Sequence, residues 1–89
     1  MHQQIGTLKI LWPYVKRKGL YAIEDLTTSY LSDYEGGFRK PDTAVEFLKA
    51  LVDDVNLQGN KDDLVTDIES IQFDHSMCCL LKNKTPNRL

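Results

Sequence analysis

The feature that most constrains the fold is an apolar stripe of helical period between residues 43 and 56. Thr43 and Glu46 have the spacing of a capping box, in which a hydroxyl accepts a hydrogen bond from a backbone N–H of the first helical turn. Apolar side chains then recur every three or four residues, which predicts an amphipathic helix over 43–56. The stripe consists of Ala44, Phe47, Leu48, Leu51, Val52 and Val55.

Other segments show a similar period. Residues 4–18 carry an apolar stripe that Pro13 interrupts, because proline lacks an N–H group and its ring strikes the preceding turn. A first helix therefore ends near Leu11, or a second one begins at Pro13. Further helical segments are expected at 20–26, 28–35, 61–73 and 77–81. The expected core includes Leu48, Leu51, Leu64 and Ile68.

These patterns predict an all-α fold, a small single-domain bundle of about five helices. Residues 7–15 could compete as a strand, but one strand has no partner. We expect residues 1–81 to form this helical domain. Residues 82–89 have no periodicity and contain a proline, so we expect a frayed C-terminal tail there.

The two cysteines, Cys78 and Cys79, are adjacent and cannot readily bridge each other. This excludes a disulfide scaffold and favours a reducing compartment, so we expect a cytoplasmic protein. No apolar run approaches the roughly 20 residues of a membrane span, and no signal peptide is recognisable. We therefore expect no membrane partner.

Charge is unevenly distributed along the chain. Residues 1–41 sum to +2 and residues 42–89 to −4, within a net charge of −2. This net negative charge disfavours purely electrostatic binding of nucleic acid, but the distribution permits one basic face on the N-terminal half.

Signatures of catalysis are absent from the sequence. It has no Gly-rich phosphate loop, nucleophile elbow or Cys-x-x-Cys pair. His75 lies near the two cysteines, but a zinc site needs four ligands, or three and a water molecule. The sequence thus predicts no enzyme, no catalytic residues, no metal, no cofactor and no small-molecule substrate.

One constellation is more specific, and it lies in residues 29–51. Leu31 would anchor a helix, Gly37 would permit a turn, and Pro41 would begin the next helix. The segment resembles the recognition-helix end of helix-turn-helix domains of the Cro/phage-repressor type. The positions that match are Ser29, Leu31, Ser32, Glu35, Gly37, Arg39 and Pro41, followed by Leu48 and Leu51.

The resemblance implies a small DNA-binding transcriptional regulator with a recognition helix near 28–35. Hydroxyl and carboxylate side chains of that helix would face base edges, and basic side chains around it would contact phosphates. Such a small domain would bind duplex DNA as a homodimer. The implied DNA-binding residues are Lys16, Arg17, Thr28, Ser29, Ser32, Asp33, Arg39 and Lys40.

The alternative is a protein–protein interaction module, such as an immunity, inhibitor or adaptor protein. Its acidic C-terminal half would bind a basic protein partner. Segments 11–51 and 61–81 are also similar to a death-fold domain of the caspase-recruitment type, which implies homotypic assembly. The acidic protein-binding residues would be Asp53, Asp54, Asp62, Asp63 and Asp67.

Overall fold

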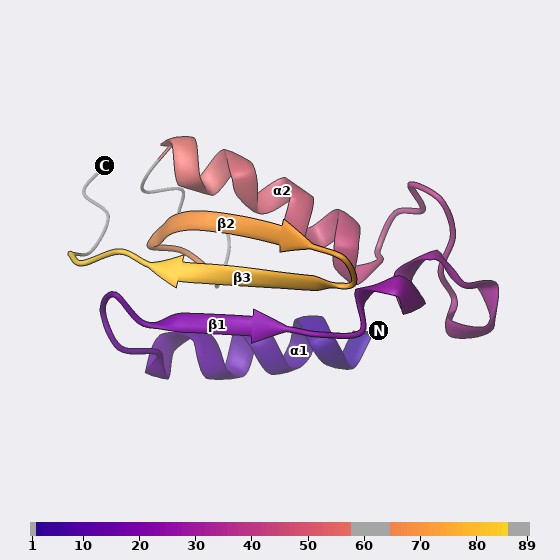
Figure 1. The fold of residues 1–89 in the computed structure, drawn as a ribbon, viewed down its shortest axis with the longest axis horizontal. Helices are drawn as coiled ribbons and strands as arrows, with labels where there is room; N and C mark the ends of the chain where they lie inside the picture. The colour runs from indigo at the N-terminus through magenta and orange to yellow at the C-terminus, as the bar shows by residue number, and fades with distance from the viewer. Residues whose placement is uncertain (1, 58–64, 86–89) are drawn as a thin grey trace.

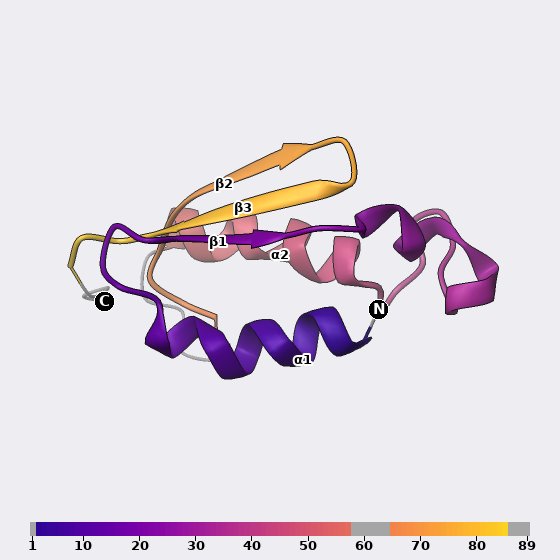
Figure 2. The same cartoon turned by 60° about the horizontal axis from the view of Figure 1, so that its bottom comes forward.

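The computed structural model describes residues 2–57 and 65–85 of the 89-residue chain. Within these ranges, β1 (Leu20–Ile23), β2 (Ile68–Asp74) and β3 (Met77–Lys82) form an antiparallel sheet in the order β1-β3-β2 (Figure 1). The helices α1 (His2–Leu11) and α2 (Ala44–Leu57) pack on one face of it (Figure 2). The expected all-α bundle is therefore wrong.

One hydrophobic core lies between the sheet and the two helices. In β1 and β3, alternate side chains point into it, and the register pairs Tyr21 with Leu80 and Ile23 with Cys78. The helices add Trp12 from the turn after α1 and the inner face of α2. The buried core consists of Leu8, Trp12, Ile23, Leu26, Ala44, Val45, Leu48, Leu51, Val65, Ile68, Cys78 and Leu80.

The N-terminal helix and α2 follow the sequence pattern. The helix α1 ends at Leu11, and a 3₁₀ turn, Trp12–Tyr14, carries Pro13 near its start. At α2, Thr43 Oγ1 accepts a hydrogen bond from the Glu46 N–H at 3.3 Å, so the predicted cap is confirmed. Core positions Leu48, Leu51 and Ile68 are also confirmed, whereas Leu64 lies outside the described residues.

Three segments expected as helices are strands, and β2 shows why. Ile68 pairs with Lys82 and Ile71 with Leu80, so three steps along β2 match two steps along β3. A bulge at Glu69 adds the extra residue and keeps both isoleucines on the helix-covered face. Their spacing of three residues therefore imitates a helix. Helices were expected over 20–26, 61–73 and 77–81, whereas the described parts of these segments contain the strands Leu20–Ile23, Ile68–Asp74 and Met77–Lys82, and residues 61–64 lie outside the described residues.

Residues 26–43, here called the arm, project from one end of the molecule (Figure 1). The arm holds two 3₁₀ turns, Leu26–Tyr30 and Ser32–Tyr34, separated by the extended residue Leu31. The recognition helix expected over 28–35 is therefore wrong. A Cβ at Gly36 would collide with the backbone oxygen of Ser29, so the arm folds back on itself there.

The C-terminal end of the described chain continues the sheet. Lys82 is the last residue of β3, and Asn83 N–H donates to the Asp67 carbonyl at 2.8 Å. Residues 86–89 lie outside the described residues. The division into residues 1–81 and a tail of 82–89 stays a prediction, without the helical character expected of the first part.

Candidate functional site

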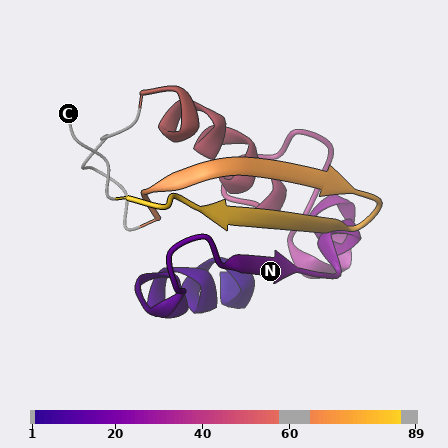
Figure 3. The same cartoon turned by 60° about the vertical axis from the view of Figure 1, so that its left-hand side comes forward.

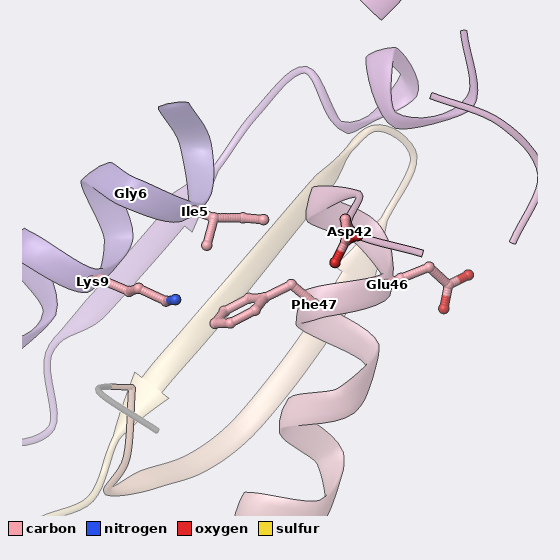
Figure 4. A pocket seen from close by; sticks show the side chains of 6 residues that line it. All are labelled: Ile5, Gly6, Lys9, Asp42, Glu46 and Phe47. Atoms are coloured by element: carbon pink, nitrogen blue, oxygen red, sulfur yellow. The ribbon is translucent and has the colours of Figure 1, made fainter. Parts of the chain in front are cut away.

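An open groove of about 630 Å³ lies between α1 and the start of α2 (Figure 4). One wall comes from successive turns of α1, and the other from the first turn of α2 with the residue before its cap. The groove is lined by Ile5, Gly6, Lys9, Asp42, Glu46 and Phe47.

The apolar floor of the groove belongs to the core. Ile5 and Phe47 are half-buried and pack against the core cluster, one from each helix. The Lys9 ammonium lies 5.2 Å from the centre of the Phe47 ring, where the negative face of the ring attracts a cation. In Figure 4 these two side chains point toward each other across the groove.

The rim on the α2 side is acidic. Asp42 has a left-handed backbone with φ of 65°, which turns the chain into the cap at Thr43. Glu46 Oε1 accepts a hydrogen bond from Lys49 Nζ at 3.0 Å, within the same helix. The groove therefore offers an aromatic face, an ammonium and two carboxylates, which suits ligand recognition.

A second polar cluster joins the two ends of the described chain. Lys82 Nζ donates to the carbonyl of Trp12 at 2.9 Å and lies 5.2 Å from its ring centre. Burial lowers the pKa of Lys82, nearby Arg17 lowers it further, and Asp67 opposes both. Trp12 Nε1 donates to the Thr66 carbonyl at 2.6 Å. Since the ammonium binds carbonyls after α1, the cluster stabilises the fold.

The residues expected to read DNA do not share one exposed helical face. Ser29 is 1% exposed, and its hydroxyl accepts a hydrogen bond from the Val45 N–H at 3.3 Å. Thr28 Oγ1 donates to the Asp25 carbonyl at 2.9 Å. Ser32 and Asp33 are exposed on the second turn of the arm.

The expected phosphate contacts lie apart from one another. Arg17 forms an ion pair with Asp67 at 3.1 Å, near the sheet, and Lys16 is exposed beside it in sequence. Arg39 and Lys40 lie in the arm, where the Arg39 guanidinium lies 5.0 Å from the centre of the Phe38 ring.

The expected acidic surface is also interrupted. Asp54 is 1% exposed, so it cannot meet a partner at the surface. Asp67 is engaged with Arg17, and Asp53 is exposed. Asp62 and Asp63 lie outside the described residues.

The sequence prediction missed the groove because its parts are far apart in the chain. Lys9 and Phe47 look like ordinary members of two amphipathic helices until the fold places them face to face. Within residues 2–57 and 65–85, no three His, Cys, Asp or Glu side chains are placed to hold one metal ion. Neither α-helix there has the length and apolar character of a membrane span.

Comparison with known proteins points to methyltransferases. No family model matches the chain. It is 36% identical over 64 residues to L-olivosyl-oleandolide 3-O-methyltransferase of Streptomyces antibioticus, which covers 67% of this chain and 17% of that protein. The chain therefore spans about a sixth of this relative's length.

Solved structures agree. MycE methyltransferase from the mycinamycin biosynthetic pathway, in complex with Mg, SAH and mycinamycin VI, matches with a TM-score of 0.73 and 26% identity. The match covers 86% of this chain and 22% of that one. A crystal form with Mg and SAH alone gives a TM-score of 0.69, also at 26% identity, over 86% of this chain and 21% of that one.

These findings overturn several sequence predictions. The resemblance to Cro/phage-repressor domains was misleading, and both the DNA-binding regulator and the interaction or adaptor module are wrong, because the relatives are methyltransferases. The prediction that the chain has no part in an enzyme is wrong for the same reason. The expected partners, duplex DNA or a basic protein with no small-molecule substrate, are wrong as well, since MycE was solved in complex with Mg, SAH and mycinamycin VI.

Proposed function

We propose that this chain is a substrate-recognition module of a methyltransferase that uses S-adenosylmethionine and acts on a hydroxyl of a glycosylated macrolide. The observation that carries the proposal is the match of 86% of the chain, at a TM-score of 0.73, to a methyltransferase bound to SAH and mycinamycin VI. The 36% identity to a 3-O-methyltransferase supports the same chemistry.

The described residues do not fit the methyl donor. Nucleotide cofactors in open α/β sheets bind beyond the carboxyl ends of parallel strands, beside glycine-rich turns. This sheet is antiparallel, and the glycine pair Gly36–Gly37 lies in the arm rather than between a strand and a helix. We therefore assign binding of the methyl donor to the remainder of such a methyltransferase, outside the segment that is similar to this chain.

The described residues also supply no cluster that points to Mg²⁺. Within residues 2–57 and 65–85, no three His, Cys, Asp or Glu side chains are placed to hold one metal ion. The contribution we propose for this chain is binding and orientation of the acceptor.

The groove between α1 and α2 is the surface we assign to that role. Its aromatic floor and polar rim are the combination typical of small-molecule sites. Lys9 and Asp42 face it from opposite sides, and both can hydrogen-bond to hydroxyl or carbonyl groups of an acceptor. We also propose a cytoplasmic location, which the two free thiols, Cys78 and Cys79, support.

The experiment exchanges segments between enzymes. In the Streptomyces antibioticus relative, the segment that matches this chain is either deleted or replaced by the chain, and methylation of L-olivosyl-oleandolide is followed by mass spectrometry. We expect deletion to abolish methyl transfer, replacement to restore it, and titration calorimetry to show SAH binding in both proteins. Full activity after deletion, or SAH binding to the isolated chain, contradicts the proposal.

A matched pair of variants tests the groove within the active chimera. Lys9→Met removes the ammonium above Phe47, and Lys16→Met removes an exposed ammonium that lies outside the groove lining. We expect the first to raise KM for the acceptor and the second to leave it unchanged. Equal effects of the two changes contradict the assignment of the groove.

A further inference from the structure

A second pocket, of about 310 Å³, lies where the arm meets the turn between β2 and β3, and we call it the tip pocket. Figures 1 and 3 show the base of the arm beside this hairpin turn. The pocket is separate from the groove and shares no lining residue with it. It is lined by Leu26, Thr27, Tyr30, Val45, Phe73, Asp74, His75 and Ser76.

The tip pocket has an apolar floor and aromatic walls. Leu26 and Val45 are buried in the core and form the floor. Tyr30 and Phe73 remain 46% and 43% exposed although they line a concave site. Removal of aromatic surface from water is favourable, so a ligand that covers both rings gains binding free energy.

Hydrogen bonds hold the pocket in shape without a ligand. The Leu26 N–H donates to the Ser76 carbonyl at 3.0 Å, and the Thr27 N–H donates to Ser76 Oγ at 3.2 Å. Thr27 Oγ1 and Ser76 Oγ lie 3.2 Å apart and share a further hydrogen bond. These contacts fix the start of the arm to the hairpin turn, so ligand binding need not order either segment.

The polar rim selects against anionic ligands. Asp74 and His75 supply a carboxylate and an imidazole, and the lining contains no lysine or arginine. A phosphate or carboxylate ligand would meet the Asp74 carboxylate without a compensating cation. A hydroxyl group can donate to that carboxylate and bond to the imidazole in either direction.

We propose that the tip pocket binds one six-membered sugar ring of a glycoside that carries no anionic group. The apolar face of the ring lies on Tyr30 and Phe73, and its hydroxyl groups bond to Asp74 and His75. The volume is at the lower end of the range for small-molecule sites, which fits one sugar ring and excludes a whole macrolide. This inference rests on the proposed function, because it names the part of the acceptor that the module holds.

Binding is measured on the whole 89-residue chain, labelled with ¹⁵N, by NMR titration with methyl α-L-olivoside. We expect saturable shifts of amide signals around residues 26–30 and 73–76. Phe73→Ala and Tyr30→Ala, at half-exposed positions, should each weaken binding about tenfold. Tyr14→Ala removes an aromatic ring that is 81% exposed and lies outside the pocket lining, so binding should be unchanged.

Three results overturn the inference: no saturable shift, equal affinity in the two aromatic variants and the parent chain, or shifts centred on the groove at Lys9 and Phe47. The segment exchange separates these failures from failure of the proposed function. A chimera that restores methyl transfer while the isolated chain does not bind the glycoside rejects the tip pocket alone. Glycoside binding with an inactive chimera supports the tip pocket and rejects the methyltransferase role.

Discussion

The hydroxyl of Ser29 accepts a hydrogen bond from the backbone N–H of Val45, 3.3 Å away and 16 residues later in the chain. The next N–H, of Glu46, donates to Thr43 Oγ1 at the same distance. N–H groups in the first turn of a helix have no intrahelical acceptor, so side chains must satisfy them. Ser29, in the first turn of the arm, thus supplies one cap of α2, and Thr43, the last residue of the arm, supplies the other.

Ser29→Ala is expected to lower the free energy of unfolding by about 1–2 kcal/mol, because it leaves the buried Val45 N–H without its acceptor. Urea unfolding followed by circular dichroism measures this change. Ser32→Ala is the control, since Ser32 is an exposed serine of the same arm. It should change stability by less than about 0.5 kcal/mol. Equal effects of the two substitutions would show that the cap contributes nothing.

Leu48→Ala is expected to cost about 2–5 kcal/mol, because it removes a buried side chain at the centre of α2 and leaves a cavity. Val52→Ala, on the exposed face of the same helix, should cost far less. Thermal and urea unfolding of both variants test this difference. Similar losses would mean that α2 does not pack against the sheet through its Leu48 face.

The elements that the sequence predicted correctly are those with local causes. The helix α2 combines a cap at Thr43 with an uninterrupted apolar stripe, and both signals lie within the helix itself. The end of α1 at Leu11 is equally local, because Pro13 prevents the helix from continuing regularly. Neither needed knowledge of a partner segment.

The strands could not be predicted from the sequence, because which of their side chains are buried depends on how the strands pair. In β3, one row of side chains (Cys78, Leu80 and Lys82) is buried, while Cys79 and Leu81 on the opposite face are half-buried and also apolar. Alternation of burial is therefore invisible in a run such as Met77–Lys82. The buried Lys82 misleads further, because a charged residue suggests solvent, whereas its ammonium binds the Trp12 carbonyl.

The candidate sites could not be predicted from the sequence for a related reason. The groove and the tip pocket join residues that are tens of positions apart, such as Lys9 with Phe47 and Tyr30 with Phe73. The Ser29–Pro41 pattern imitates a recognition helix because serine, glycine and proline mark the ends of many unrelated turns. Here Ser29 caps α2 instead.

Deletion of Glu69 is expected to destabilise the protein by about 2–4 kcal/mol, because loss of the bulge residue turns Ile68 toward the outer face of the sheet. Glu69→Ala keeps the bulge and loses the exposed ion pair with Lys18, which is 2.8 Å long. That control should cost at most about 1 kcal/mol. Hydrogen exchange of the β2 and β3 amides measures both. Equal protection in the deletion variant and the parent chain would contradict the register.

Stability should fall above pH 9 because of the Cys78 thiol. Burial, with a smaller effect from Cys79, raises the pKa of Cys78 from 9.0 to about 12. Between these values the unfolded chain releases this proton and the folded chain retains it.

The unfolding free energy should therefore decrease by up to about 1.4 kcal/mol per pH unit through this window, and Cys78 contributes no such slope below pH 9. Urea unfolding at pH 7, 9 and 10.5 measures the decrease, and Cys78→Ala should remove its share of it. The raised pKa of Tyr21 also lowers stability as the pH rises, whereas the lowered pKa of Lys82 has the opposite effect. Both contributions are present in variant and parent, so they cancel when the two proteins are compared. Cys79→Ala removes only the secondary cause, so most of the slope should remain. A Cys78→Ala protein as sensitive to alkali as its parent would place the thiol in contact with water.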